Sequence, residues 1–228
     1  MTTDGVVLVH GSNLTAACWD AVIGHLAVPA VAIDLPGRGS RPADIVTVTL
    51  DDCVDAVIES ARQAGFTRFV LVGHSLGGVV ITEGARRIPN RVAALVYVGA
   101  LVPAPGMNAA SIMFGDDLPT ADPRTTTEDR AKLFFASGMT DDQWDEVWRH
   151  FVPESPLLWN ARLTGFPDDV PITYVSMVDD VGVPPALAEQ MIANAGTNVT
   201  HQVLSAGHLV MVTKPLELAN AINQAIDR

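Results

Sequence analysis

Two short segments of the chain are apolar at every position. Residues 69–72 read Phe-Val-Leu-Val and residues 95–98 read Leu-Val-Tyr-Val. A strand with one face in water alternates apolar and polar residues, whereas a strand covered by helices on both faces does not. The two segments are therefore predicted to be central strands of a mostly parallel sheet, which makes the predicted fold class α/β.

Further strand-like and helix-like segments alternate along the chain, as expected for βαβ units. Strands are predicted at residues 6–9, 31–34, 68–73, 92–99, 172–177 and 200–204. Helices are predicted at residues 16–26, 50–64, 76–88, 185–195 and 215–226, with Thr49 and Asp51 as N-terminal caps of the second helix.

The region 101–167 interrupts this alternation. It has no strong strand pattern, contains several prolines and carries many large apolar side chains. It is predicted to be a helical insertion that lies over the sheet as a cap. With 228 residues the chain is expected to form a single domain, 1–228, that includes this insertion.

Charge and composition limit the partners of the protein. The formal net charge of -12 disfavours binding to nucleic acid and to anionic lipid surfaces, because both are negatively charged. Residues 1–4 lack a basic segment, and the apolar run 5–9 is too short for a signal peptide or a membrane span. A cytoplasmic protein that binds neither nucleic acid nor membrane is expected. Cys18 and Cys53 have no metal-binding or disulfide spacing, so no metal site is predicted.

One pentapeptide carries a chemical signature. Gly73-His74-Ser75-Leu76-Gly77 has the G-x-S-x-G pattern and lies between a predicted strand and a predicted helix. A serine on such a sharp turn needs small neighbours, because a larger side chain there would collide with adjacent elements. Ser75 is therefore the predicted catalytic nucleophile.

A serine nucleophile requires a base within hydrogen-bonding reach, and histidine has a suitable pKa. His208 follows the last predicted strand, so it should lie at the same sheet edge as Ser75, where open α/β sheets bind ligands. The other histidines lie in a predicted helix, strand, insertion or turn and are interpreted as structural: His10, His25, His74, His150 and His201.

The base in turn requires a carboxylate that orients its ring and stabilises its charged form. Asp179 and Asp180 follow the predicted strand 172–177 and precede His208, whereas the end of the preceding strand has no carboxylate. Both aspartates are candidates on these grounds.

Two backbone N–H groups are predicted to form the oxyanion hole. Leu76 directly follows the nucleophile, and Ser12 follows the first predicted strand, where Gly11 allows the chain to turn over the site.

These motifs resemble the α/β-hydrolase superfamily over essentially the whole chain. The resemblance rests on Val9-His10-Gly11-Ser12, Asp34-Leu35-Pro36-Gly37-Arg38-Gly39, Gly73-His74-Ser75-Leu76-Gly77 and Gly207-His208. Other segments are similar to the branch of plant methylesterases and hydroxynitrile lyases, which also contains bacterial esterases: Trp19, Ile172-Thr173-Tyr174-Val175, Val183-Pro184 and Gly207-His208-Leu209-Val210-Met211.

The resemblance implies an α/β-hydrolase fold whose cap shapes the substrate pockets. In that branch the catalytic aspartate lies six residues after the tyrosine position and four before the proline, which favours Asp180 over Asp179. The lyases carry a lysine after the catalytic histidine, whereas this chain has Leu209, so hydrolysis is preferred. The predicted substrate-binding residues are Trp19, Phe114, Phe134, Trp159 and Leu209.

The predicted function is hydrolysis of a small to medium carboxylic ester, with methyl esters among the candidates, by a Ser-His-Asp triad and an acyl-enzyme. No cofactor is predicted. The alternatives are a cofactor-free lyase or lactone-tailoring enzyme at the same site, and a hydrolase-fold receptor for a small molecule. The expected partner is a small-molecule ester substrate, and a homodimer is left open.

Overall fold

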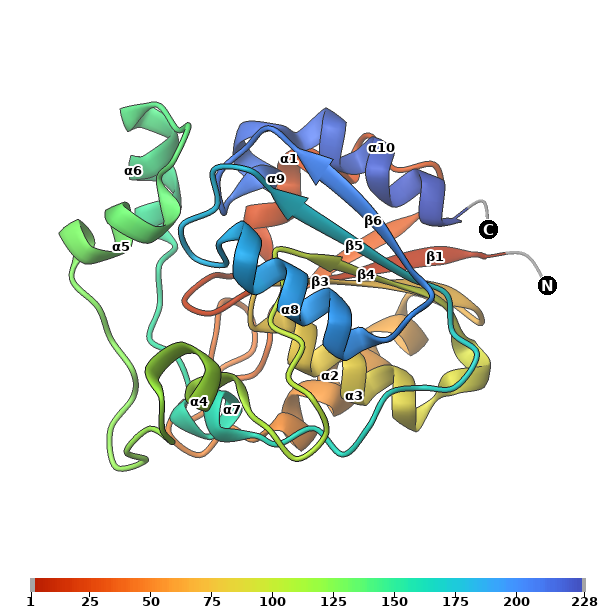
Figure 1. Cartoon of the computed structure of the whole chain (residues 1–228), viewed down its shortest axis with the longest axis horizontal. Coiled ribbons are helices and arrows are strands. Elements are labelled where there is room, and N and C mark those ends of the chain that lie inside the picture. The colour runs from red at the N-terminus through yellow and green to blue at the C-terminus, as the bar shows by residue number, and fades with distance from the viewer. Residues whose placement is uncertain (1–2, 227–228) are drawn as a thin grey trace.

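A six-stranded, all-parallel sheet forms the centre of the protein, in the order β2-β1-β3-β4-β5-β6 (Figure 1). The computed structural model describes residues 3–226. The strands are β1 Gly5–Val9, β2 Ala30–Ile33, β3 Phe69–His74, β4 Val92–Val98, β5 Ile172–Met177 and β6 Val199–Leu204. All six predicted strands are confirmed to within one residue at each end, and β3 and β4 are the central pair.

Helices cover both faces of this sheet. They are η1 Ala16–Trp19, α1 Asp20–Ile23, α2 Leu50–Gln63, α3 Gly77–Arg87, η2 Pro89–Arg91, α8 Pro185–Ala195, α9 Val210–Thr213 and α10 Pro215–Ile226. Helices α1 and α10 lie on one face, and α2, α3 and α8 lie on the other (Figure 1). The α/β fold class is thereby confirmed.

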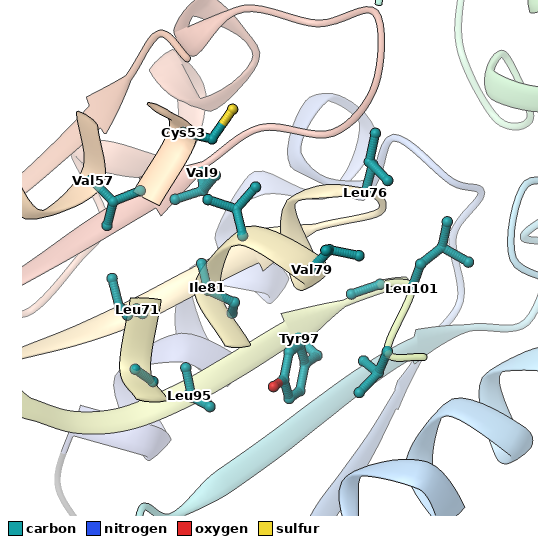
Figure 2. Close-up of a cluster of buried hydrophobic side chains, with 14 of the residues drawn as sticks. Val9, Cys53, Val57, Leu71, Leu76, Val79, Ile81, Leu95, Tyr97 and Leu101 are labelled. Carbon is teal, nitrogen blue, oxygen red and sulfur yellow. The ribbon is translucent and has the colours of Figure 1, made fainter. Parts of the chain in front are cut away.

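The central strands are apolar throughout because their side chains enter two cores in turn. Leu71 of β3 packs with residues of α2 and α3, including Val57 and Ile81, as Figure 2 shows. Val70 and Val72 point to the opposite core, which α10 closes. All three β3 side chains are fully buried. The two cores hold the end of β3, and thus Ser75, in a fixed place.

Two predicted features of the helices are wrong. The predicted helix 16–26 is a 3₁₀ turn followed by one α-helical turn that ends at Ile23. The next N–H groups, of His25 and Leu26, bond to carbonyls only three residues back, which closes a turn instead of extending the helix. Thr49 does cap α2, but its partner in the capping box is Asp52, since the third helical position faces the cap.

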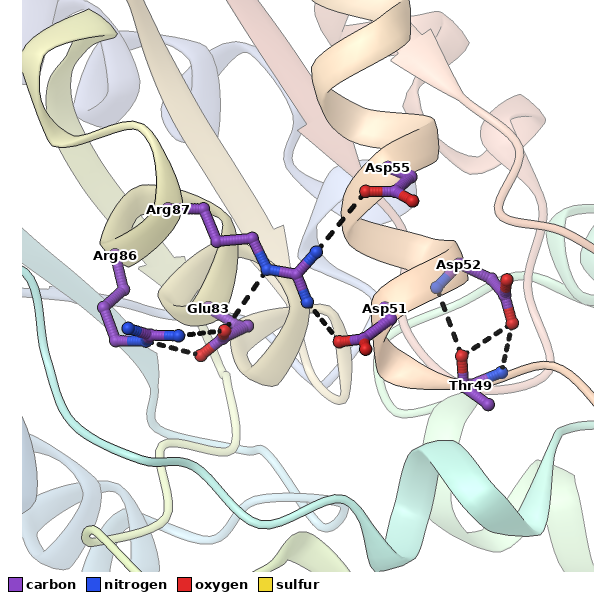
Figure 3. A network of polar contacts seen from close by, with 7 residues as sticks. All are labelled: Thr49, Asp51, Asp52, Asp55, Glu83, Arg86 and Arg87. Atoms are coloured by element: carbon purple, nitrogen blue, oxygen red, sulfur yellow. Dashed lines mark hydrogen bonds and ion pairs between the residues drawn. The ribbon is translucent and has the colours of Figure 1, made fainter.

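Asp51, which was predicted as a cap, points to α3 instead. There it pairs with Arg87, which also contacts Asp55 at 3.4 Å and Glu83 at 3.3 Å (Figure 3). Exposed ion pairs contribute little one by one, but a shared arginine restricts how two helices can slide. The network therefore ties α3, which begins just after Ser75, to α2.

The insertion contributes helices and no strand to the sheet. Its helices are α4 Ala109–Phe114, α5 Glu128–Phe135, α6 Asp141–Arg149 and α7 Pro156–Asn160. They gather beyond the carboxyl ends of the strands (Figure 1). Within residues 3–226, neither these helices nor those beside the sheet are long and apolar enough to cross a membrane.

Candidate active site

The strand order creates a crevice at the carboxyl ends of β1 and β3. After β1 the chain forms β2, which pairs with one edge of β1. It later forms β3, which pairs with the other edge of β1. Loops that follow neighbouring strands diverge at such a point, and open α/β sheets bind ligands there. The loop that starts at His10 and the turn at Ser75 both lie at this edge.

Ser75 lies on a strained turn between β3 and α3. Its φ angle is 50°, in the left-handed region that residues with a side chain rarely adopt. Neighbouring backbone holds the turn: the Ser75 N–H donates to Val98 O at 3.1 Å, and its carbonyl accepts from Gly78 at 3.0 Å and Leu101 at 2.9 Å. A strained backbone that its surroundings stabilise is a recurrent feature of functional sites.

The glycines around Ser75 permit close backbone approaches. A Cβ atom at Gly77 would lie 2.6 Å from His10 O, and one at Gly78 would lie 2.6 Å from Leu101 O. A Cβ at Gly11, in the loop after β1, would lie 2.8 Å from the Ser75 Cβ. Backbone atoms cannot withdraw as a flexible side chain can, so the predicted need for small neighbours is confirmed.

His208 and Asp180 form a buried pair. His208 Nδ1 lies 2.9 Å from both carboxylate oxygens of Asp180, and each side chain is at most 1% exposed. Because a carboxylate only accepts, Nδ1 carries a proton and donates it. The Val183 N–H donates to Asp180 Oδ1 at 2.7 Å and so orients the carboxylate. Asp179 is exposed and makes no contact of this kind within residues 3–226.

Ser75 and His208 line the same pocket. Their side chains are not hydrogen-bonded to each other in the described part of the chain. In unliganded enzymes such bonds are often long and tighten when a substrate binds. The pocket therefore brings together a serine hydroxyl and a histidine ring.

A second buried histidine supports the first. His74 Nε2 lies 3.0 Å from the carbonyl oxygen of His208, so it carries the proton and donates. Burial, and then the proximity of His208, lowers the pKa of His74 well below its usual value. The neutral ring packs 4.5 Å from the His208 ring. It holds the His208 loop without adding positive charge to it.

Contacts with the cap hold the loop that carries Ser12. Asn13 has a φ angle of 65°, and its side chain and backbone pair with Val152 at 2.8 and 3.0 Å. The Asn13 N–H donates to Glu154 at 3.3 Å, and Glu154 forms a fully buried ion pair with Arg38. The loop shape therefore depends on residues far away in the sequence.

The two predicted oxyanion donors have free N–H groups. Neither the Ser12 N–H nor the Leu76 N–H has a hydrogen-bond acceptor among the residues that the structure describes. The Leu76 side chain points into the core, so only its backbone can serve the site (Figure 2). Free N–H groups beside a nucleophile are available to a developing oxyanion.

Three of the predicted substrate-binding residues line the pocket. Phe114 of α4 and Trp159 of α7 pack with ring centroids 5.1 Å apart, and Phe134 of α5 joins them. Phe114 and Phe134 are 40% and 37% exposed, so their rings are accessible to a ligand. The cap therefore supplies an aromatic wall to the pocket that Ser75 also lines.

The predictions for Trp19 and Leu209 are corrected by the structure. Both side chains are fully buried in the core on the α10 side of the sheet, away from the pocket lining. Both are close in sequence to site residues. However, Trp19 belongs to the same core cluster as Val22, and Leu209 points into this core although His208 next to it lines the pocket.

Sequence reasoning missed two basic residues of the pocket, Arg124 and Arg130. Arg124 lies in a loop without periodicity, and Arg130 looks like an ordinary surface residue of a short helix. No local pattern marks either one, because the path of the cap over the sheet brings them to Ser75. Within residues 3–226 no group of three His, Cys, Asp or Glu side chains is placed to hold a metal ion.

The sequence profile of the Alpha/beta hydrolase family matches residues 6–221 of the chain. This match spans all six strands apart from Gly5, and every site residue described above. The chain belongs to the alpha/beta hydrolase family.

Relatives of this hydrolase include named esterases. The pyrethroid hydrolase of Sphingobium wenxiniae is 26% identical in an alignment that covers 100% of this chain and 89% of that protein. Methylesterase 7 of Arabidopsis thaliana is 27% identical, with 97% and 96% covered. The crystal structure of a pyrethroid hydrolase from Sphingobium faniae has a TM-score of 0.82 at 25% identity and covers 99% and 98% of the two chains. The resemblance to the methylesterase branch is thereby confirmed.

Gly182 packs against the His208 ring and provides a test of its position. A Cβ at this site would lie 2.9 Å from His208 Cγ and Nδ1. We expect Gly182→Ala to displace the ring and lower ester turnover by the hydrolase by about 100-fold, because small misplacements of catalytic groups are costly. The control is Gly165→Ala, where no atom lies within 4 Å. Steady-state hydrolysis and thermal unfolding of both variants check this, and equal activities would contradict the placement of His208.

Proposed function

We propose that this hydrolase is a serine esterase in which Ser75, His208 and Asp180 act as a triad. The observation that supports this most is the buried His208–Asp180 pair, with contacts of 2.9 Å, beside a strained serine in the same pocket. Burying a carboxylate without a hydrogen-bonding partner costs free energy, and the contact with His208 offsets that cost. An arrangement that leaves Nε2 free to accept a proton suits general-base catalysis.

In the proposed mechanism, His208 Nε2 accepts the Ser75 proton as Ser75 Oγ bonds to the ester carbonyl carbon. The carbonyl π electrons move to the oxygen, which the Ser12 and Leu76 N–H groups stabilise. Collapse of the tetrahedral species breaks the bond to the alcohol, which takes its proton from His208. Water then attacks the acyl-enzyme with His208 again as base, and this step releases the acid and restores Ser75.

The proposed substrates are carboxylic esters of small to medium size, methyl esters included. The named relatives support this range, since one is a pyrethroid hydrolase and another is a methylesterase. The aromatic wall of Phe114, Phe134 and Trp159 supports it as well, because apolar surface favours the hydrocarbon part of an ester. The chemistry described requires no cofactor.

The experiment that tests the proposal combines turnover and labelling. The wild type is assayed on p-nitrophenyl esters from acetate to decanoate, and then treated with a serine-directed phosphonylating reagent. We expect hydrolysis, complete inhibition, and a single modified peptide that contains Ser75. The acyl length of the best ester reports the depth of the pocket.

Two other outcomes would contradict the proposal. Turnover that persists after complete reaction of Ser75 would exclude the acyl-enzyme. Turnover of a non-ester substrate without covalent labelling would favour the lyase alternative, in which Ser75 and His208 serve only as acid and base.

A further inference from the structure

Two cationic side chains from the cap line the pocket that contains Ser75 and His208. Arg124 lies in the loop before α5, and Arg130 lies on α5 itself. The proposed hydrolysis of a neutral ester uses neither of them. Their position therefore requires an explanation beyond the triad.

Arg124 is held in a defined place. Its guanidinium carbon lies 4.0 Å from the centroid of the Phe114 ring and 5.6 Å from that of Trp159. Its backbone pairs with Glu154 through hydrogen bonds of 2.8 and 2.9 Å. A guanidinium that stacks on aromatic faces still presents its N–H donors at its edge. That edge is suited to bind a planar anion such as a carboxylate in a bidentate manner.

Neither arginine has an acidic partner in the described part of the chain. Two carboxylates of the cap are engaged elsewhere: Glu154 pairs with Arg38, and Glu128 accepts from Trp144 Nε1 at 2.9 Å. Within residues 3–226, neither Arg124 nor Arg130 forms an ion pair, although the chain contains 26 acidic residues and only 14 lysines and arginines.

The two guanidinium groups also disfavour each other. Partial burial, and then the charge of Arg130, lowers the pKa of Arg124. Both effects are costs of holding a cation in the pocket without a counter-ion. An anion placed between the two side chains would offset both. The arrangement is therefore complementary to a negatively charged group of a ligand.

We propose that Arg124 and Arg130 form an anion subsite and that the preferred ester carries a carboxylate group on the part of the molecule remote from the scissile bond. This inference rests on the proposed esterase function. The aromatic wall of Phe114 and Trp159 packs on the hydrocarbon segment between the two groups, while the arginines bind the carboxylate. The substrate class is then a half-ester of a dicarboxylic acid or a comparable acidic ester.

A matched pair of esters tests this proposal. Monomethyl adipate and methyl hexanoate have the same chain length and the same ester, and they differ only in a terminal carboxylate in place of a methyl group. We expect the wild type to have a kcat/KM for monomethyl adipate about tenfold or more above that for methyl hexanoate. The ratio of these two kcat/KM values is expected to fall about 10- to 100-fold in Arg124→Gln and in Arg130→Gln, mainly because KM for the acidic ester rises.

Lys132→Gln is the control for loss of a positive charge. Lys132 lies on the same helix as Arg130, is 46% exposed and does not line the pocket. The ratio is expected to stay within about twofold of the wild type in this variant. If loss of the Arg124 stacking on Phe114 destabilises the cap, Arg130→Gln still tests the subsite, because the Arg130 side chain is exposed.

Binding to Ser75→Ala separates the subsite from the chemistry. Calorimetric titration of Ser75→Ala with monomethyl adipate is expected to show binding. Adding Arg124→Gln to this variant is expected to raise the Kd about tenfold or more. Equal turnover of both esters by the wild type, or a ratio that neither arginine variant changes, would overturn the subsite and leave the esterase intact. Absence of turnover of the p-nitrophenyl esters and of both methyl esters, together with arginine-dependent binding, would overturn the esterase and retain the subsite.

Discussion

Replacing Ser75 with alanine is expected to lower the turnover of a p-nitrophenyl ester by about five orders of magnitude. The variant removes the Ser75 hydroxyl, which lies on the strained turn after β3 and lines the pocket, so in the proposed mechanism His208 would have no nucleophile to activate. Ser75 is only 8% exposed and alanine keeps its Cβ, so the fold should persist. Initial rates at saturating ester, compared with the uncatalysed reaction, measure the effect.

The matched control for this variant is Ser111→Ala. Ser111 belongs to the cap helix α4, and its hydroxyl donates to Asn108 O at 3.0 Å outside the pocket lining. We expect its turnover to stay within about threefold of the wild type. Thermal unfolding of both variants verifies that they are folded. Turnover by Ser75→Ala within tenfold of the wild type would exclude Ser75 as the nucleophile.

Asp180→Asn is expected to lower kcat by about four orders of magnitude while the fold is retained. The Val183 N–H donates to Asp180 Oδ1, so the asparagine carbonyl would take that place. Its NH₂ group would then occupy the Oδ2 position, 2.9 Å from His208 Nδ1, and donate to it. This moves the ring proton to Nε2, which can no longer accept the proton of Ser75.

Asp179→Asn is the control for Asp180→Asn, because it removes the same charge from the adjacent, exposed residue. Its kcat is expected to stay within about threefold of the wild type. The ¹⁵N NMR signals of the His208 ring report the tautomer directly, and only Asp180→Asn should change it. Similar kcat values for the two variants would assign the acid to another residue.

The strands could be predicted because their signal is local. β3 and β4 lie between helices on both faces, and burial on both faces requires an apolar residue at every position. The nucleophile turn was equally visible, since Gly73, Gly77 and Gly78 are needed wherever backbone passes so close to backbone. The first helix was predicted too long because hydrophobic periodicity does not distinguish a 3₁₀ turn from an α-helix.

The side-chain directions could not be predicted, because they depend on distant contacts. Trp19 and Leu209 belong to segments that resemble the active-site motifs, yet core packing directs both away from the pocket. The two aspartates differ for the same reason. Spacing in the sequence allowed both, and the resemblance to the methylesterase branch favoured Asp180. The contact with His208 now distinguishes the buried Asp180 from the exposed Asp179.

The sequence by itself determined the α/β sheet, the serine turn and the order of serine, acid and histidine along the chain, since these depend on local hydrophobicity, glycine spacing and chain order. Only the tertiary structure decided what surrounds them. The path of the cap, which no periodic pattern records, brings Arg124 and Arg130 to the pocket and Glu154 to the loop of Ser12. Contacts between residues far apart in the sequence result from packing of the whole chain, so they become visible only when the chain is folded.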